Sequence, residues 1–258
     1  MALQAGLTSA DSALLRPFWF NAIGPPWVVS LLVYAVVAAV RFFAFLSPYS
    51  LQELFFLQAV ALWSLPFVFL SQSGRREIGL TERGATGIAM LFSIVAGSAC
   101  AAAFFALGMV IYGGSPNNWC ISIRDYLHLE EMRGLMPPLG LFALYALPAT
   151  FLNPIGEEIL FRGFMQESFA RRFNRTAGAV VSSLLFGLIY LYLHGIWSDA
   201  AGFHVRIGSA ALALILMACT GAVFTLCRSL SGSLWPAVAA HAAFNLTLLG
   251  ATILEFTH

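Results

Sequence analysis

Two adjacent glutamates and an arginine stand inside an apolar stretch in the second half of the chain. The stretch reads NPIGEEILFR, and its charged residues are Glu157, Glu158 and Arg162. Glu158 and Arg162 are four positions apart, so on a helix they share a face and can form an ion pair. Glu157 points about 100° away from Glu158 on a helix of 3.6 residues per turn. Its carboxylate is therefore free to face another partner and could act as a general base.

Residues that weaken a helix surround this pair of glutamates. Pro148 and Pro154 precede Glu157, and Gly156 adjoins it. Broken helices at membrane depth are tolerated where they line a cavity. We therefore expect a water-accessible pocket beside Glu157, while the alternative is a charge cluster that only locks helices together.

A second polar pair lies near the end of the chain, in SGSLWPAVAAHAAFN. His241 and Asn245 are four positions apart and project from one helical face, among alanines that allow another helix to approach closely. Such a pair can bind a metal ion together with water, or donate hydrogen bonds to a developing oxyanion. Hydrogen bonding between helices is the alternative role.

A third stretch, SSLLFGLIYLYLHG, places Phe186, Tyr190 and His194 on one stripe of a helix. A single histidine near a helix end can equally be a capping or interfacial residue. Tyr192 faces elsewhere and fits a packing or interfacial role.

The composition identifies the surroundings of these polar residues. The 258 residues are 60% hydrophobic and 10% charged, whereas soluble domains are about 45–50% apolar and about 25% charged. A water-soluble fold could not bury so much apolar surface. Because apolar stretches recur along the whole chain, we expect one integral membrane domain over residues 1–258, with the motifs in the segment 139–255. The net charge of +1 indicates no nucleic-acid partner, and the expected surroundings are the lipid bilayer.

The apolar stretches predict an all-α, polytopic transmembrane bundle of about seven or eight membrane-embedded helices. A span needs about 20 apolar residues, and the candidates are 25–46, 51–71, 86–112, 139–167, 177–196, 207–228 and 233–255. The segment 113–138 is rich in Pro, Gly and charge, which predicts an external loop with a short interfacial helix around Asp125–Met132.

The distribution of arginine predicts the orientation of the bundle, since short cytoplasmic loops carry an excess of basic residues. Eight arginines fall on one side if the N-terminus is cytoplasmic, and three fall on the other. The eight are Arg16, Arg75, Arg76, Arg83, Arg171, Arg172, Arg175 and Arg228, and the three are Arg124, Arg133 and Arg206. All 13 basic residues are arginine, and this bias in an alanine-rich chain favours a bacterial protein of the inner membrane.

Two of these stretches resemble motifs of one protease family. EEILFR (157–162) resembles the EExxxR motif of the CAAX protease and bacteriocin-processing (CPBP) family, which includes the type II CAAX prenyl endopeptidases. The closing stretch, with His241 and Asn245, is similar to the HxxxN motif of that family. The resemblance covers about residues 150–250, and the first half of the chain matches only in being helical.

The middle motif of the family, FxxxH, is altered here. Phe186 is present, but Tyr190 stands four residues later and His194 follows one turn further on. At about 1.5 Å per residue, Tyr190 lies roughly 20 Å from the cytoplasmic start of its span, and Glu157 lies at a similar depth. Tyr190 therefore matches Glu157 in depth better than His194 does, although both remain candidates.

The resemblance implies an intramembrane endopeptidase in which Glu157 activates a water molecule as general base. Glu158 and Arg162 would hold the pocket, and His241 and Asn245 would steady the attacking water or the tetrahedral oxyanion. Tyr190 or His194 would complete that role. The family has been described both as metalloproteases and as glutamate proteases, so the implied cofactor is either none or a divalent metal such as zinc.

The expected substrate is a membrane-anchored protein or peptide that is cleaved near its membrane-proximal end, as in C-terminal or sorting-signal processing. Tyr190 in place of histidine motivates an alternative, a non-catalytic binding or immunity protein of the same fold. A transporter or proton-coupled carrier is a third hypothesis, because buried Glu, Arg and His also form proton relays. That hypothesis predicts inverted repeats, and the sequence shows none.

Overall fold

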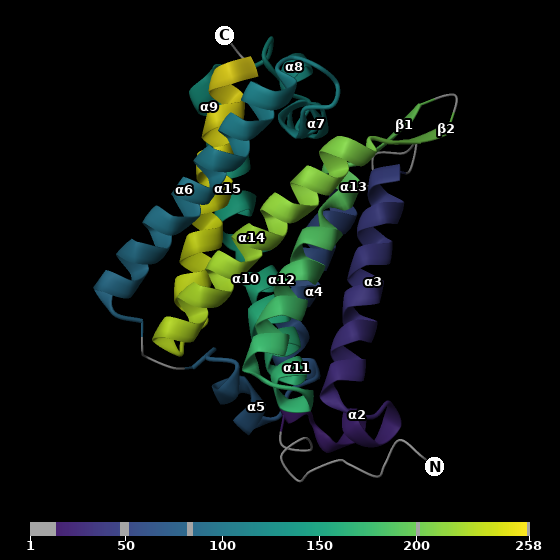
Figure 1. Cartoon of the computed structure of the whole chain (residues 1–258), viewed down its shortest axis with the longest axis vertical. Helices are drawn as coiled ribbons and strands as arrows, with labels where there is room; N and C mark the ends of the chain where they lie inside the picture. Colours follow the sequence, from purple (N-terminus) through teal and green to yellow (C-terminus); the bar gives the residue numbers. More distant parts are fainter. Residues whose placement is uncertain (1–13, 47–51, 82–84, 200–201, 257–258) are drawn as a thin grey trace.

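The structure is a computed structural model that describes residues 14–46, 52–81, 85–199 and 202–256. The described chain is a bundle of long helices with short elements at both ends (Figure 1). This confirms the predicted all-α class, apart from one short β-hairpin.

Within the described ranges, six helical segments are long and apolar enough to cross a bilayer. They are α3 (Pro26–Leu46), α6 (Gly87–Tyr112), the segment Pro138–Arg172, the segment Arg175–His194, α14 (Ile207–Ser231) and α15 (Trp235–Phe256). A further apolar helix, α4 (Gln52–Val68), has 17 residues and falls short of a full span. All seven predicted stretches are thus helical, but the predicted count of seven or eight spans is not confirmed.

The span that carries the two glutamates is divided into five pieces. They are α9 (Pro138–Leu147), η1 (Pro148–Leu152), α10 (Asn153–Glu158), η2 (Ile159–Met165) and α11 (Gln166–Arg172), where η1 and η2 are π-helical. Pro148 and Pro154 have no N–H to donate, so the regular α-helical ladder cannot pass through them. π-Helical turns inside α-helices are frequent at functional sites. The predicted weakening of this helix is confirmed.

Close contact between α6 and α15 fixes the last span. A Cβ atom on Gly97 of α6 would lie 1.9 Å from the carbonyl oxygen of Ala240 in α15. Only glycine permits this approach of the two backbones. His241 follows Ala240 directly, so the contact also holds the histidine in place.

The short elements gather at opposite ends of the bundle (Figure 1). One end has α2 (Pro17–Ala22), α5 (Gln72–Glu77) and α11, and we call it the arginine-rich end. The other has α7 (Trp119–Tyr126), α8 (Leu129–Met132) and the antiparallel hairpin of β1 (Ile196–Asp199) and β2 (Gly202–Val205), and we call it the α7–α8 end.

The α7–α8 end differs from the sequence analysis in two ways. The predicted interfacial helix at Asp125–Met132 is two helices, because the chain turns between them at His128 with a left-handed φ of 50°. The hairpin was not predicted. Its strands are four residues each, too short for their alternation to stand out in an apolar sequence.

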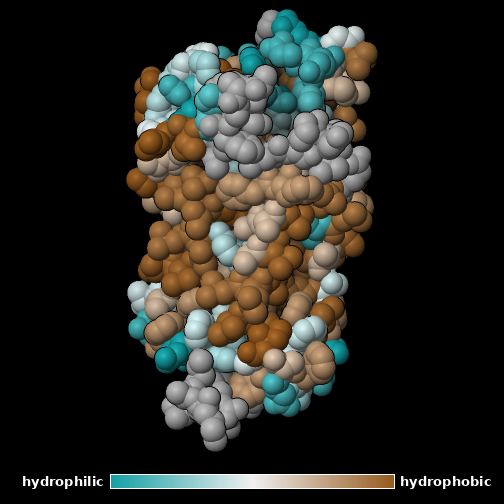
Figure 2. Space-filling model, turned by 90° about the vertical axis from the view of Figure 1, so that its right-hand side faces the viewer, coloured by the Kyte–Doolittle hydropathy of each residue, from teal (hydrophilic) through white to brown (hydrophobic). Residues whose placement is uncertain are grey.

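Hydrophilic residues gather at both ends of the bundle, and a band of apolar side chains lies between them (Figure 2). Large apolar residues are widely exposed on this band, including Val36, Ile88 and Val110 at 64%, 82% and 83%. Seven described arginines lie at the arginine-rich end or on the helix turns beside it, and Arg83 lies outside the described residues. The seven are Arg16, Arg75, Arg76, Arg171, Arg172, Arg175 and Arg228. These features define a multi-pass membrane protein.

Candidate active site

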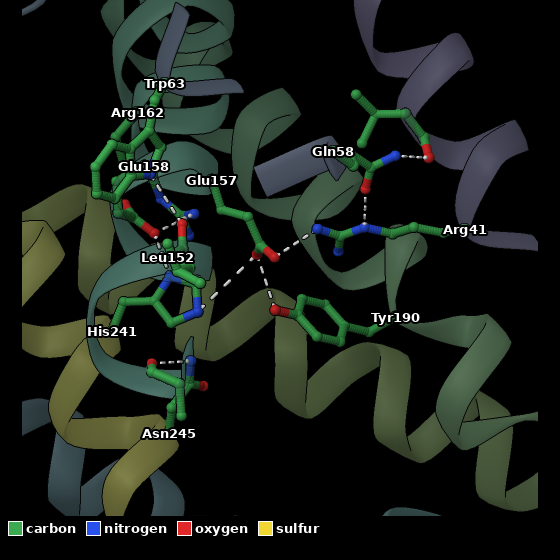
Figure 3. A network of polar contacts seen from close by, with 12 residues as sticks. Arg41, Gln58, Trp63, Leu152, Glu157, Glu158, Arg162, Tyr190, His241 and Asn245 are labelled. Carbon is green, nitrogen blue, oxygen red and sulfur yellow. Dashed lines mark hydrogen bonds and ion pairs between the residues drawn. The ribbon is translucent and has the colours of Figure 1, made fainter. Parts of the chain in front are cut away.

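Glu157 is the centre of a buried polar network at the depth of the membrane (Figure 3). Its carboxylate is 2% exposed and comes from α10. Oε1 accepts a hydrogen bond from Arg41 Nη2 at 2.6 Å, and Oε2 accepts one from the Tyr190 hydroxyl at 2.8 Å. Nε2 of His241 lies 3.9 Å from Oε2. As predicted, Glu157 faces partners other than its neighbour Glu158.

Arg41, from α3, was missed by the sequence analysis. Its side chain is 5% exposed, and its Nε donates to Gln58 Oε1 at 2.8 Å. Gln58 in turn donates from Nε2 to the Val37 carbonyl at 2.9 Å, which orients its amide. A single arginine in an apolar span costs about 3 kcal/mol on insertion scales and so calls for a partner. A single arginine in an apolar span was thus the sequence signal for a buried partner, but the signal does not reveal which carboxylate is that partner.

Glu158 and Arg162 form the ion pair that their spacing predicted. Arg162 Nη1 donates to Glu158 Oε1 at 3.1 Å, and both side chains are fully buried. Arg162 Nη2 also donates to the Gly221 carbonyl at 2.9 Å, and the guanidinium lies 4.2 Å from the centre of the Phe186 ring. The pair therefore connects α10 and η2 to α12 (Arg175–Ile189) and α14.

His241 lies between the two carboxylates. Its Nδ1 is 2.8 Å from Glu158 Oε1, and its Nε2 faces Glu157. The ring is stacked on Phe224, with 5.0 Å between ring centres, and is 1% exposed. A proton on Nδ1 is held by Glu158, which leaves Nε2 directed toward Glu157. The separation of 3.9 Å allows one water to bind both groups.

Asn245, one turn after His241, connects the last span to the broken one. Its Nδ2 donates to the carbonyl of Ala149 in η1 at 3.0 Å. This carbonyl lies next to Pro148, where the helical hydrogen-bond ladder is interrupted. Asn245 therefore contacts the backbone of η1 beside the site. Among the described hydrogen bonds, none joins Asn245 to either glutamate.

Tyr190 and His194 differ in their relation to Glu157. Tyr190 ends α12 and contacts Glu157 directly, and its ring lies 5.9 Å from the Arg41 guanidinium. His194 ends α13 (Leu191–His194), is buried, and stacks against Tyr190 at 6.1 Å between ring centres. Its Nδ1 has no hydrogen-bond partner among the described residues. Tyr190 therefore contacts Glu157 directly, and no hydrogen bond among the described residues joins His194 to Glu157.

A cavity of about 310 Å³ adjoins Glu157, as the broken helix led us to expect. Its walls include Glu157 and two of its three polar neighbours, together with His194 and Asn245, whereas His241 is not among the wall residues. Those wall residues are Arg41, Glu157, Tyr190, His194 and Asn245. Apolar and aromatic side chains from α4, α7, η1, α13 and α15 supply much of the rest of the wall.

A larger cavity of about 600 Å³ lies between α3 and α4. Its walls are apolar apart from Gln58 and Ser64, and neither glutamate contributes to it. Because chemistry needs polar groups that converge on one point, we place the site in the smaller cavity.

A divalent metal such as zinc does not fit the residues around Glu157. In the described part of the chain, no three His, Cys, Asp or Glu side chains are grouped closely enough to hold a metal ion. Both oxygens of Glu157 and Oε1 of Glu158 instead accept hydrogen bonds from arginine or tyrosine. Zinc sites in enzymes commonly have three protein ligands, and this donor set offers no such group.

A buried network of glutamate, arginine and histidine inside a bundle of apolar helices defines a membrane protein with a polar site at bilayer depth. Residues 139–247 match the family described as type II CAAX prenyl endopeptidase Rce1-like. The resemblance predicted from the motifs is thereby confirmed for this segment, and it supports an intramembrane protease. All seven predicted site residues lie inside the match, whereas Arg41 lies outside it. No curated protein and no solved structure matches the chain significantly.

Proposed function

We propose that this protein is an intramembrane endopeptidase that hydrolyses a peptide bond of a membrane-anchored substrate with water activated by Glu157. The observation that carries the proposal is the position of Glu157, a buried carboxylate on the wall of a cavity between membrane spans. A charged group at this depth is costly, and Glu157 lies on the cavity wall as well as in the ion pair with Arg41. The family match over residues 139–247 supports the same activity.

Glu157 acts as the general base in this mechanism. Arg41 pairs with the Glu157 carboxylate, and a carboxylate oxygen that accepts one hydrogen bond keeps a second lone pair for water. Glu157 takes a proton from the water as the oxygen attacks the peptide carbonyl carbon, which gives a tetrahedral oxyanion. The proton then passes to the amide nitrogen, the C–N bond breaks, and the products are a carboxylate and an amine.

The surrounding donors stabilise the charge that develops on the carbonyl oxygen. His241 and Tyr190 both lie beside Glu157 Oε2, and they can orient the water and donate to the oxyanion. Glu158 and Arg162 hold the histidine ring, while Asn245 fixes the π-helical turn beside the cavity. Fixed donors in a site closed to bulk water commonly supply much of the rate enhancement. No step of this mechanism uses a metal ion.

The experiment compares membranes from cells that make the wild type, Glu157→Gln or Glu255→Gln, with mass spectrometry of all protein termini. Glu255 is an exposed glutamate at the α7–α8 end of α15, so its variant is the matched control. We expect termini beside transmembrane segments that are present with the wild type and the control but absent with Glu157→Gln. If termini are identical in all three at equal protein abundance, the proposal is wrong.

A second candidate function is a non-catalytic binding or immunity protein of the same fold, because Tyr190 stands where the family motif has histidine. That function predicts that Glu157→Gln changes no terminus but alters which membrane protein co-purifies with the chain. Purified wild type that cleaves a peptide in a Glu157-dependent manner would exclude it.

We also infer that the protein resides in a bacterial inner membrane with a cytoplasmic N-terminus. The excess of arginine at one end of the bundle supports this orientation. Processing of a C-terminal anchor or sorting signal is the substrate class that best suits a site at membrane depth, since the enzyme meets both the anchor and its flanking peptide.

A further inference from the structure

The wall of the cavity beside Glu157 includes residues of α7 and α13, two elements that lie at or near the α7–α8 end (Figure 1). Phe55 and Phe56 lie at the start of α4. Wall residues between Tyr190 and His194 lie at the end of the segment Arg175–His194, next to the hairpin. The wall residues of α15 run from Phe244, near the middle of the helix, to Leu249, on the side that leads toward α8. Ile123, Tyr126 and Leu127 from the α7 region complete the wall on this side.

The opposite side of Glu157 is closed by packed side chains and ion pairs. Every residue of η2, Ile159–Met165, is buried. Beyond η2, Arg171 pairs with Glu77, and Arg228 pairs with Glu167 and donates to the Glu77 carbonyl. Among the described residues, none from α5, η2 or α11 contributes to the cavity wall. The cavity wall thus extends from Glu157 toward the α7–α8 end, while buried residues of η2 and these ion pairs lie on the side of the arginine-rich end.

The arginine distribution assigns these ends to the two sides of the membrane. Seven described arginines belong to the arginine-rich end, while Arg124, Arg133 and Arg206 belong to the α7–α8 end. Short loops with an excess of basic residues face the cytoplasm. The α7–α8 end is accordingly the non-cytoplasmic one.

We propose that substrates reach Glu157 from the non-cytoplasmic side, so that they are exported, membrane-anchored chains cleaved on that side of their anchor. This inference rests on the proposed protease function and specifies its substrate class. A chain attached to the membrane only at its cytoplasmic face would meet the closed end. The cavity volume of about 310 Å³ is at the lower end of the range for small-ligand sites, so the cleaved segment is a short extended stretch rather than a folded domain.

Cysteine labelling tests the access route without relying on activity. In a variant whose four native cysteines are replaced by alanine, one cysteine is introduced as Asn153→Cys, Leu127→Cys or Gln72→Cys. Asn153 lines the cavity at the start of α10, Leu127 lines its α7 side, and Gln72 is exposed on α5 at the arginine-rich end. Intact and permeabilised cells are treated with a charged, membrane-impermeant maleimide.

We expect the Asn153→Cys and Leu127→Cys variants to be labelled in intact cells and the Gln72→Cys variant only after permeabilisation. Labelling of the Gln72→Cys variant in intact cells would reverse the orientation and overturn the proposal. The proposal is also wrong if the Asn153→Cys variant is labelled only after permeabilisation, or in neither condition although the protein is folded and monodisperse.

The termini that depend on Glu157 then separate this inference from the protease function. If these termini lie on the non-cytoplasmic side of their anchors, both the access route and the protease function are supported. If they lie on the cytoplasmic side, the protease function stands and the access route is wrong. If labelling is as expected but no terminus depends on Glu157, the route stands and the protease function is wrong.

Discussion

Arg41 and Glu157 form an ion pair of 2.6 Å between α3 and α10, although 116 positions separate them in the chain. The pair links the first long span, which lies outside the family match, to the element that carries the proposed general base. Both side chains are almost completely buried, so each charge depends on the other for compensation.

We predict that Arg41→Met lowers the free energy of unfolding by about 3 kcal/mol, because removing one partner leaves an uncompensated buried charge. The double variant Arg41→Met/Glu157→Gln should recover part of this loss, since the remaining group is neutral. The measurement is unfolding in mixed detergent micelles, with Arg76→Met at an exposed position as control. A double variant less stable than Arg41→Met alone would show that the pair is not coupled in this way.

Tyr190 and His194 can be distinguished by single substitutions. Tyr190→Phe keeps the ring but removes the hydroxyl that donates to Glu157 at 2.8 Å. A hydrogen bond to a charged group contributes about 1.5–3 kcal/mol, so we expect kcat to fall by roughly 10- to 100-fold. His194→Gln, which alters no described contact with Glu157, should leave kcat per folded molecule nearly unchanged. The reverse pattern would assign the role of the missing histidine to His194.

The parts of the site that the sequence predicted are those set by spacing along one helix. Glu158 and Arg162 pair because four positions return to the same face, and Glu157 turns away from them for the same reason. The break at Pro148 and Pro154 was also readable, because proline lacks the N–H that the ladder requires. These relationships need only one element and its local geometry.

The parts that the sequence did not predict depend on how different elements pack. Arg41 meets Glu157 only because α3 lies against the broken span, and no local pattern connects residues so far apart. The contact of Glu158 with His241 likewise needs α15 to lie beside α10. The length of α4 was overestimated because apolar composition continues past Val68, where the regular helix ends.

Chelation should leave the enzyme active. In the described part of the chain, no three His, Cys, Asp or Glu side chains are grouped closely enough to hold a metal ion, and the proposed mechanism needs none. We expect the same rate of Glu157-dependent cleavage before and after treatment with EDTA or 1,10-phenanthroline, and no stoichiometric zinc in the purified protein by elemental analysis. Loss of activity on chelation, with recovery on addition of zinc, would contradict the metal-free mechanism.

Gly97 tests whether the backbone contact of α6 with α15 holds His241 in position. In Gly97→Ala the new Cβ would lie 1.9 Å from the Ala240 carbonyl oxygen, so α15 must move. Overpacking of this kind costs about 1–3 kcal/mol, and the shift should also reduce cleavage because His241 is the next residue.

Gly87→Ala is the matched control, since a Cβ there meets nothing within 4 Å at the start of the same helix. Thermal unfolding in detergent and the cleavage rate are both measured. If the two variants behave alike, α6 does not approach α15 this closely, and the packing that places His241 beside the glutamates must be revised.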